Sequence, residues 1–210
     1  MSKGYSCREL RQDPLFLRSD FPMKGKYGMP VIKKCDLDIS ALDLIGSDKI
    51  KKNDMSSNIL KTVHFFVEDN KLDRYYNQPQ NYLERLAQYP HVLTPDYSLY
   101  TDMPIALQIY NTFKSRWCGA YWQENNLSVI PSVSWSTDAS YDFCFDGLEN
   151  GSVVAVSTVG GLLKKEIFLR GYFEMKTRIA PKQILCFGQA FTEMGDEVLF
   201  VDYEETWRGR

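Results

Sequence analysis

The chain has 210 residues, of which 44% are hydrophobic and 14% aromatic, so it can fill a core without disulfides or structural metal ions. Its 25 Lys and Arg against 27 Asp and Glu give a formal charge of -2, which excludes a global basic field that would attract nucleic acid or anionic lipid. We expect one soluble domain over residues 1–210, with an irregular lead-in over residues 1–30.

The cysteines and the apolar runs indicate the compartment. No stretch is long and apolar enough for a signal peptide or a membrane span, so we expect no membrane partner. The 5 cysteines are an odd number and form no C-x-x-C pair, which is typical of reduced thiols in the cytoplasm. With only 2 histidines in the chain, no Cys/His metal site is expected.

Short runs of β-branched and aromatic residues recur along the chain and are typical of buried strands. They are Val31-Ile32, Val63–Val67, Val92-Leu93, Leu127–Ile130, Val153–Val156, Ile184–Phe187 and Val198–Val201. Segments long enough for a helix lie between several of them, at Tyr82–Tyr89, Asp102–Gln123 and Lys164–Arg178. Because strands that are apolar throughout need cover on both faces, this order predicts an α/β fold of largely parallel (β/α) repeats, barrel-like or an open sheet.

The segment Asp102–Gln123 carries the strongest helix pattern. Asp102 is suited to cap this helix, and Pro104 fits its first turn. An apolar residue at every fourth position predicts a stripe that faces the sheet, made of Ile105, Ile109, Phe113, Trp117 and Tyr121. The polar side chains of the same helix are expected toward solvent or a partner, namely Gln108, Lys114, Ser115 and Arg116.

The gap between the last two predicted strands is too short for a crossover helix. We therefore expect these strands, Ile184–Phe187 and Val198–Val201, to pair as a C-terminal antiparallel hairpin. The turn of this hairpin is expected at Glu193–Asp196.

Carboxylates follow several predicted strands where the strands end. In parallel α/β folds these carboxyl ends open into the loops that hold ligands. Asp96, Glu68 and Asp202 are the candidate catalytic residues, which would bind Mg²⁺ as a cofactor that activates water, or divide the roles of acid and base. The alternative is that these carboxylates only cap helices and turns.

Two proline-containing loops supply candidate ligand-binding residues. In Thr94–Ser98, Pro95 stiffens the backbone that presents Asp96 and Ser98. In Ile130–Ser136, Ser134 offers a hydroxyl beside Trp135, whose large ring can stack on a base or a sugar. The alternative for Trp135 is that it covers the mouth of the sheet.

A third loop, Ser157–Gly161, follows an apolar strand and precedes a helix. Ser157, Thr158, Gly160 and Gly161 can present hydroxyl and backbone N–H groups to an anion, and Lys164 adds positive charge. The loop matches neither the P-loop nor the Rossmann spacing, so a tight strand-to-helix turn is the alternative. The sequence also contains no G-x-S-x-G elbow and no H-E-x-x-H, which disfavours hydrolases of those types.

Several motifs between residues 94 and 160 resemble a bacterial family known as domain of unknown function 4417. They are Thr-Pro-Asp-Tyr-Ser (94–98), Pro-Ile-Ala-Leu-Gln-Ile-Tyr-Asn (104–111), Ile-Pro-Ser-Val-Ser-Trp (130–135) and Val-Ala-Val-Ser-Thr-Val-Gly (154–160). The resemblance covers residues 60–207. It implies an accessory protein of a phage, plasmid or integrative element that acts in the bacterial cytoplasm, and it implies no known reaction.

Three functions of different classes follow from these observations. The first is a module that binds a nucleotide or nucleic acid in a strand-end pocket, with the mobile-element setting implying replication or counter-defence. The second is a metal-dependent phosphoesterase or nuclease that uses Asp96, Glu68 and Asp202. The third is an inhibitor that binds a host protein. Carboxylates clustered at metal-ligand spacing favour the second, and an exposed apolar patch favours the third.

Overall fold

Two parallel sheets form the centre of the computed structural model, which describes residues 6–159, 164–189, 191–195 and 197–201. The first sheet runs in the order β3 (Leu44–Gly46), β4 (Thr62–His64), β5 (Val92–Leu93) and β6 (Val129–Ile130). The second runs β7 (Val153–Ser157), β8 (Gln183–Phe187) and β9 (Val198–Val201). The predicted α/β class is therefore confirmed, with parallel strands at all the predicted apolar runs except Val31-Ile32, where Ile32 forms only an isolated bridge to Leu148.

The two sheets meet at one parallel bridge, between Ser132 just after β6 and Ala155 in β7. Across the interior, the ring of Phe66 stacks on that of Phe187 with the ring centroids 4.7 Å apart, so both sheets contribute to one core. Within the described ranges, no strand pairing joins β9 back to β3. The arrangement is therefore open, and it is not a closed barrel.

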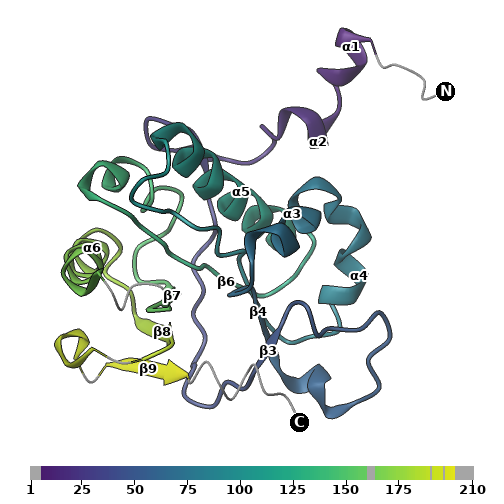
Figure 1. Ribbon diagram of the computed structural model, residues 1–210. Helices are drawn as coiled ribbons and strands as arrows, with labels where there is room; N and C mark the ends of the chain where they lie inside the picture. The colour runs from purple at the N-terminus through teal and green to yellow at the C-terminus, as the bar shows by residue number, and fades with distance from the viewer. Residues whose placement is uncertain (1–5, 160–163, 190, 196, 202–210) are drawn as a thin grey trace.

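Helices cover the outer sides of both sheets (Figure 1). On the side of the first sheet lie α3 (Asp69–Asn77), α4 (Leu83–Leu86) and α5 (Ile105–Glu124), while α6 (Lys165–Ile179) lies beside the second. Short 3-10 helices complete the connections: η1 (Ser57–Leu60), η2 (Pro79–Asn81), η3 (Asp138–Asp142) and η5 (Thr192–Met194). The helices predicted at Asp102–Gln123 and Lys164–Arg178 are confirmed as α5 and α6.

The predicted apolar stripe of α5 does not define its buried face. Ile105 is 45% exposed, whereas Gln108, Ser115 and Arg116 are buried, so the prediction that these polar residues face solvent is wrong. Positions four apart rotate by about 40° per step, so such a stripe winds around the helix. At Gly119 the helix packs too closely for a larger residue, because a Cβ there would lie 2.5 Å from Ile32. Pro104 precedes the helix at the N-cap position, and Asp102 does not cap it.

The predicted C-terminal antiparallel hairpin is wrong, because β9 pairs with β8 in parallel. The connection between Phe187 and Val198 is shorter than the dozen or so residues usual for a crossover. It succeeds because it contains the single turn of η5 and two glycines at positive φ, Gly188 and Gly195. Burial of Met194, whose carbonyl accepts a hydrogen bond from the Tyr172 hydroxyl, fixes this turn against α6.

An N-terminal segment extends away from the sheets in Figure 1 and carries α1 (Cys7–Leu10) and α2 (Pro14–Leu17). The ribbon of β1 (Met23–Lys24) and β2 (Met29–Pro30) follows it. Arg18 anchors the segment, since its guanidinium donates to the carbonyl of Tyr76 and lies 4.0 Å from the ring centroid of Trp117. Helices of the described residues include none that is long and apolar enough to cross a bilayer.

Candidate functional site

A cavity of about 240 Å³ opens at the carboxyl ends of β5, β6 and β7. Three loops and the start of α6 form its wall, as expected for ligand sites at the strand ends of parallel sheets. Among the residues proposed from the sequence, the cavity brings together Asp96, Ser98, Ser134, Trp135, Ser157 and Lys164.

Asp96 is the carboxylate that lines this cavity. The hydroxyl of Ser134 donates a hydrogen bond to its Oδ1, which connects the loop after β5 to the loop after β6. Burial raises the pKa of Asp96 from 3.8 to about 6, and the nearby Asp69 carboxylate adds to the rise. The Ser134 bond and the Arg116 charge oppose this rise. A group that is poorly solvated and close to a like charge is typical of functional sites.

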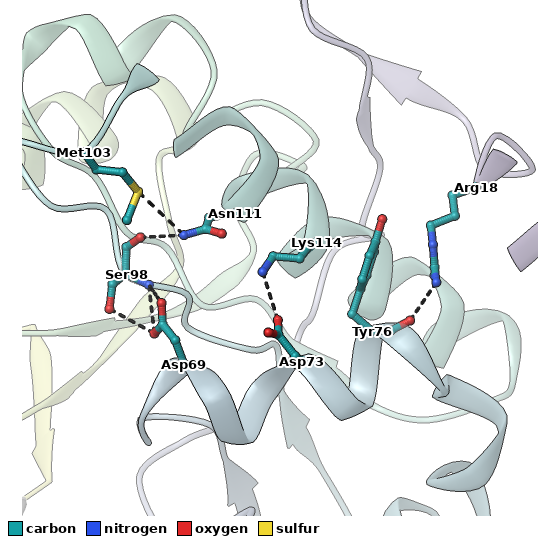
Figure 2. A network of polar contacts seen from close by, with 8 residues as sticks. All are labelled: Arg18, Asp69, Asp73, Tyr76, Ser98, Met103, Asn111 and Lys114. Atoms are coloured by element: carbon teal, nitrogen blue, oxygen red, sulfur yellow. Dashed lines mark hydrogen bonds and ion pairs between the residues drawn. The ribbon is translucent and has the colours of Figure 1, made fainter. Parts of the chain in front are cut away.

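Asp69, the first residue of α3, holds the loop that carries Asp96 (Figure 2). Its carboxylate accepts hydrogen bonds from the backbone N–H and the hydroxyl of Ser98, the latter at 3.0 Å. The carbonyl of Ser98 accepts another, from the side-chain amide of Asn111 on α5. Ser98 is thus fixed from two helices, which gives the cavity a preformed wall.

Arg116 lies beneath the cavity in the middle of α5, with 2% of its surface exposed. Its guanidinium donates to the backbone carbonyls of Asp146, Ser132 and Cys144 at 2.6–3.1 Å. Burial lowers the pKa of Arg116 to about 10. Because its recorded hydrogen bonds all go to carbonyl oxygens, Arg116 offers Asp96 its charge without a direct hydrogen bond.

Trp135 is a fixed part of the cavity wall. Its indole N–H donates to the carbonyl of Phe168 on α6 at 3.1 Å, and the two rings are 5.1 Å apart. The edge of the indole lies against Gly171, where a Cβ would come within 2.1 Å of it. Trp135 therefore both covers the strand ends, as in the alternative considered from the sequence, and presents a preoriented aromatic surface to the cavity.

Ser136 contributes a hydroxyl that lacks a partner. The residue is 1% exposed and lines the cavity, and its Oγ has no hydrogen bond to any part of the chain that the structure describes. Leaving a buried hydroxyl unpaired costs about 1–3 kcal/mol, so such groups usually face water or a ligand. The Ser136 Oγ itself is closed off from solvent, so it lies behind the cavity wall as an unpaired buried group.

The mouth of the cavity combines an aromatic ring with a positive charge. Tyr100 is 61% exposed, and Lys164 is exposed just before α6. The ammonium group of Lys164 donates to the hydroxyl of Thr101, which holds the charge over the opening. Since an ammonium has three donors, two remain for an anion at this point.

Other predicted site residues lie elsewhere. Glu68 forms an ion pair with Lys71 at 2.6 Å on the surface and does not line the cavity. Thr158 is buried with its hydroxyl donating to the carbonyl of Gln189 at 2.9 Å. Gly160, Gly161 and Asp202 fall outside the described residues. The structure thus brings Asp96 together with Asp69, not with Glu68.

The geometry also bears on the predicted metal site. No group of three or more His, Cys, Asp or Glu side chains in the described ranges is arranged to hold a metal ion. A role for Mg²⁺, and with it the phosphoesterase alternative, therefore stays a prediction without a structural argument. The same holds for binding of a host protein.

Sequence signals were weak for four of the residues that surround this site. Asp69 and Ser136 follow predicted strands but differ little from their neighbours in the sequence. Arg116 was expected at the surface of α5, and Phe168 lies within α6, away from any strand end. Each joins the site through tertiary packing, which local sequence patterns do not reveal.

Comparison with known proteins places this chain among phage proteins. It is 36% identical over 191 residues to the Gene 1 protein of Mycobacterium phage L5, an alignment that covers 90% of this chain and 82% of that protein. It is 32% identical to the Gene 1 protein of Mycobacterium phage D29, with 90% of this chain and 70% of that protein covered. No solved structure matches the chain. The family described as "Domain of unknown function (DUF4417)" matches residues 21–204, so the chain belongs to this phage-associated family, as the motifs predicted.

Proposed function

We propose that the cavity at the ends of β5, β6 and β7 binds a nucleotide, either free or at the end of a nucleic-acid strand. The observation that carries this proposal is the convergence of Trp135, several hydroxyls and Lys164 on one cavity. An aromatic wall suits a base, hydroxyls suit its polar edge and a sugar, and an ammonium at the mouth suits a phosphate.

The size of the cavity supports a small occupant. At about 240 Å³ it is smaller than the roughly 300–1,000 Å³ of pockets that enclose drug-sized ligands. A single base with part of its sugar is of the right order, whereas a dinucleotide cofactor is too large to be enclosed. The phosphates would then lie outside, near Lys164.

The charge of the chain agrees with a local mode of binding. With a formal charge of -2, affinity for nucleic acid cannot come from a general positive field. It would come from stacking on Trp135 and Tyr100, each worth about 1–3 kcal/mol for a base. Within a phage, such a site would serve replication or the countering of host defence.

Isothermal titration with nucleoside monophosphates tests this proposal. Trp135→Ala and Tyr100→Ala are expected to weaken binding about 5- to 150-fold each, in line with the loss of one stacking surface. Lys164→Ala should weaken the binding of a nucleoside monophosphate but not the binding of the corresponding nucleoside. Lys24→Ala is the matched control, since Lys24 is an exposed lysine on β1 that does not line the cavity, and binding should not change. Absence of binding to every nucleotide tested would overturn the proposal.

A further inference from the structure

The Asp96 carboxylate has acceptor capacity that the protein does not use. Ser134 is the one hydrogen-bond donor recorded for it among the described residues. A carboxylate has about four acceptor sites, so most of them remain available. Asp96 lines the cavity, and these sites are therefore accessible to whatever occupies it.

The charged groups around Asp96 are committed elsewhere. Arg116 donates to three backbone carbonyls, and Asp69 accepts from Ser98. Neither group forms a hydrogen bond to Asp96, so within the described residues the side-chain partner of this carboxylate is the Ser134 hydroxyl. A carboxylate whose acceptor sites are mostly unfilled is stabilised most by a ligand that brings N–H donors.

Resting on the proposed function, we infer that Asp96 is the specificity-determining residue of the cavity and selects guanine among the nucleobases. Guanine carries two adjacent donors on its pairing edge, the ring N1–H and the exocyclic amino group, and both can bond to one carboxylate. Adenine offers one amino donor beside a ring nitrogen that is an acceptor, and an acceptor facing the carboxylate is repelled. Uracil places a carbonyl on each side of its single N–H.

Trp135 fits the same occupant. Trp135 is held by Phe168 and Gly171 and so presents its surface without rearrangement. The base thus lies against a fixed ring with its donor edge toward Asp96.

The test compares GMP, IMP, AMP and UMP by isothermal titration at pH 7.5, with wild type and Asp96→Asn. The wild type is expected to bind GMP about 5- to 150-fold more tightly than AMP, the range found for a bidentate base contact, with IMP in between because it lacks the amino group. Asp96→Asn should lose this preference yet still bind AMP, since an amide offers both a donor and an acceptor. Asp43→Asn changes an exposed carboxylate that pairs with Lys61, and it should keep the preference.

Three outcomes would overturn the inference. If the wild type binds all four nucleotides equally and Trp135→Ala binds none of them, the proposed function remains in place and the role of Asp96 is refuted. A preference for GMP that survives in Asp96→Asn would do the same. Failure of all four to bind would refute the proposed function itself.

Discussion

The hydroxyl of Ser134 donates a hydrogen bond to Oδ1 of Asp96, and this bond links two loops that leave neighbouring parallel strands, β5 and β6. The two residues are far apart in sequence, and the shared direction of the strands brings them to one end of the sheet. The bond fixes one oxygen of the carboxylate of Asp96, a residue that lines the cavity. This arrangement has measurable consequences for stability and for binding.

The first prediction concerns the stability of Asp96→Asn. The folded pKa of Asp96 is about 6 against an ordinary value of 3.8, so between these pH values the folded state binds more protons than the unfolded state. Stability is then lost as pH rises through this window, by about 1–3 kcal/mol after allowance for solvent in the cavity. Asp96→Asn removes this loss and should be more stable than wild type at pH 7, with no difference near pH 4.

Urea unfolding at both pH values measures this difference, with Asp43→Asn as the control for removal of an exposed carboxylate. A variant less stable than wild type at pH 7 would instead mean that Asp96 only braces its loop. A gain of stability at a residue that is needed for binding is the usual trade-off at a functional site.

A pair of buried serines gives the second prediction. Ser132 and Ser136 are 2% and 1% exposed, but Ser132 Oγ donates to the carbonyl of Thr94 at 2.8 Å, whereas Ser136 Oγ has no partner within the described part of the chain. Ser132→Ala should therefore lower the free energy of unfolding by about 1 kcal/mol, and Ser136→Ala should leave it unchanged or raise it. Equal losses of stability in both variants would show that Ser136 has a structural partner.

Gly171 provides the third prediction, on the position of Trp135. Replacing a glycine within a helix by alanine ordinarily stabilises by about 0.5–1 kcal/mol. Here the new Cβ would lie 2.1 Å from the indole, so Gly171→Ala should instead destabilise by about 1–3 kcal/mol and shift the cavity wall. The double variant with Trp135→Phe should recover part of the loss, which a double-mutant cycle in urea detects. If the effects of the two substitutions on the free energy of unfolding are additive, the contact between residue 171 and Trp135 is contradicted.

The fourth prediction is the pH dependence of binding for 2′-deoxyguanosine, chosen because it lacks a phosphate group that titrates near pH 6. Its N–H donors need the ionised carboxylate of Asp96, whose pKa is about 6 in the presence of Asp69 on α3 and Arg116 on α5. Affinity should be level above pH 7 and fall by up to about tenfold per pH unit below 6. Calorimetry at pH 5, 6 and 7.5 measures it. Constant affinity over this range would contradict the assigned role of Asp96.

Sequence patterns predicted the parallel strands and much of the cavity because both depend on local features. A strand covered on both faces is continuously apolar, and residues that follow such strands reach the same end of a parallel sheet, as Asp96, Ser134 and Ser157 do. The strand β3, Leu44–Gly46, was not predicted, because it follows Asp43 and ends in a glycine, and both residue types are depleted in strands.

The sequence-based predictions were wrong where tertiary packing determines the position of a side chain or strand. Glu68 and Asp69 are adjacent in sequence, but one residue at the start of a helix turns the side chain by about 100°, which sends Glu68 to Lys71 and Asp69 to Ser98. Likewise Arg116 is buried because carbonyls from a distant loop surround it, at Asp146 and Cys144. The parallel placement of β9 depends on how η5 packs against α6, through Tyr172 and Met194.

The most direct test of the nucleotide-binding cavity follows the indole N–H resonances of the protein's 4 tryptophans by NMR during titration with GMP. Trp135→Phe assigns the resonance of Trp135, and the buried Trp117 and Trp122 serve as internal references within the same spectrum. The cavity proposal predicts a saturable shift of the Trp135 resonance while those of Trp117 and Trp122 stay in place. Unchanged spectra up to millimolar GMP and AMP, or shifts confined to Trp117 and Trp122, would contradict it.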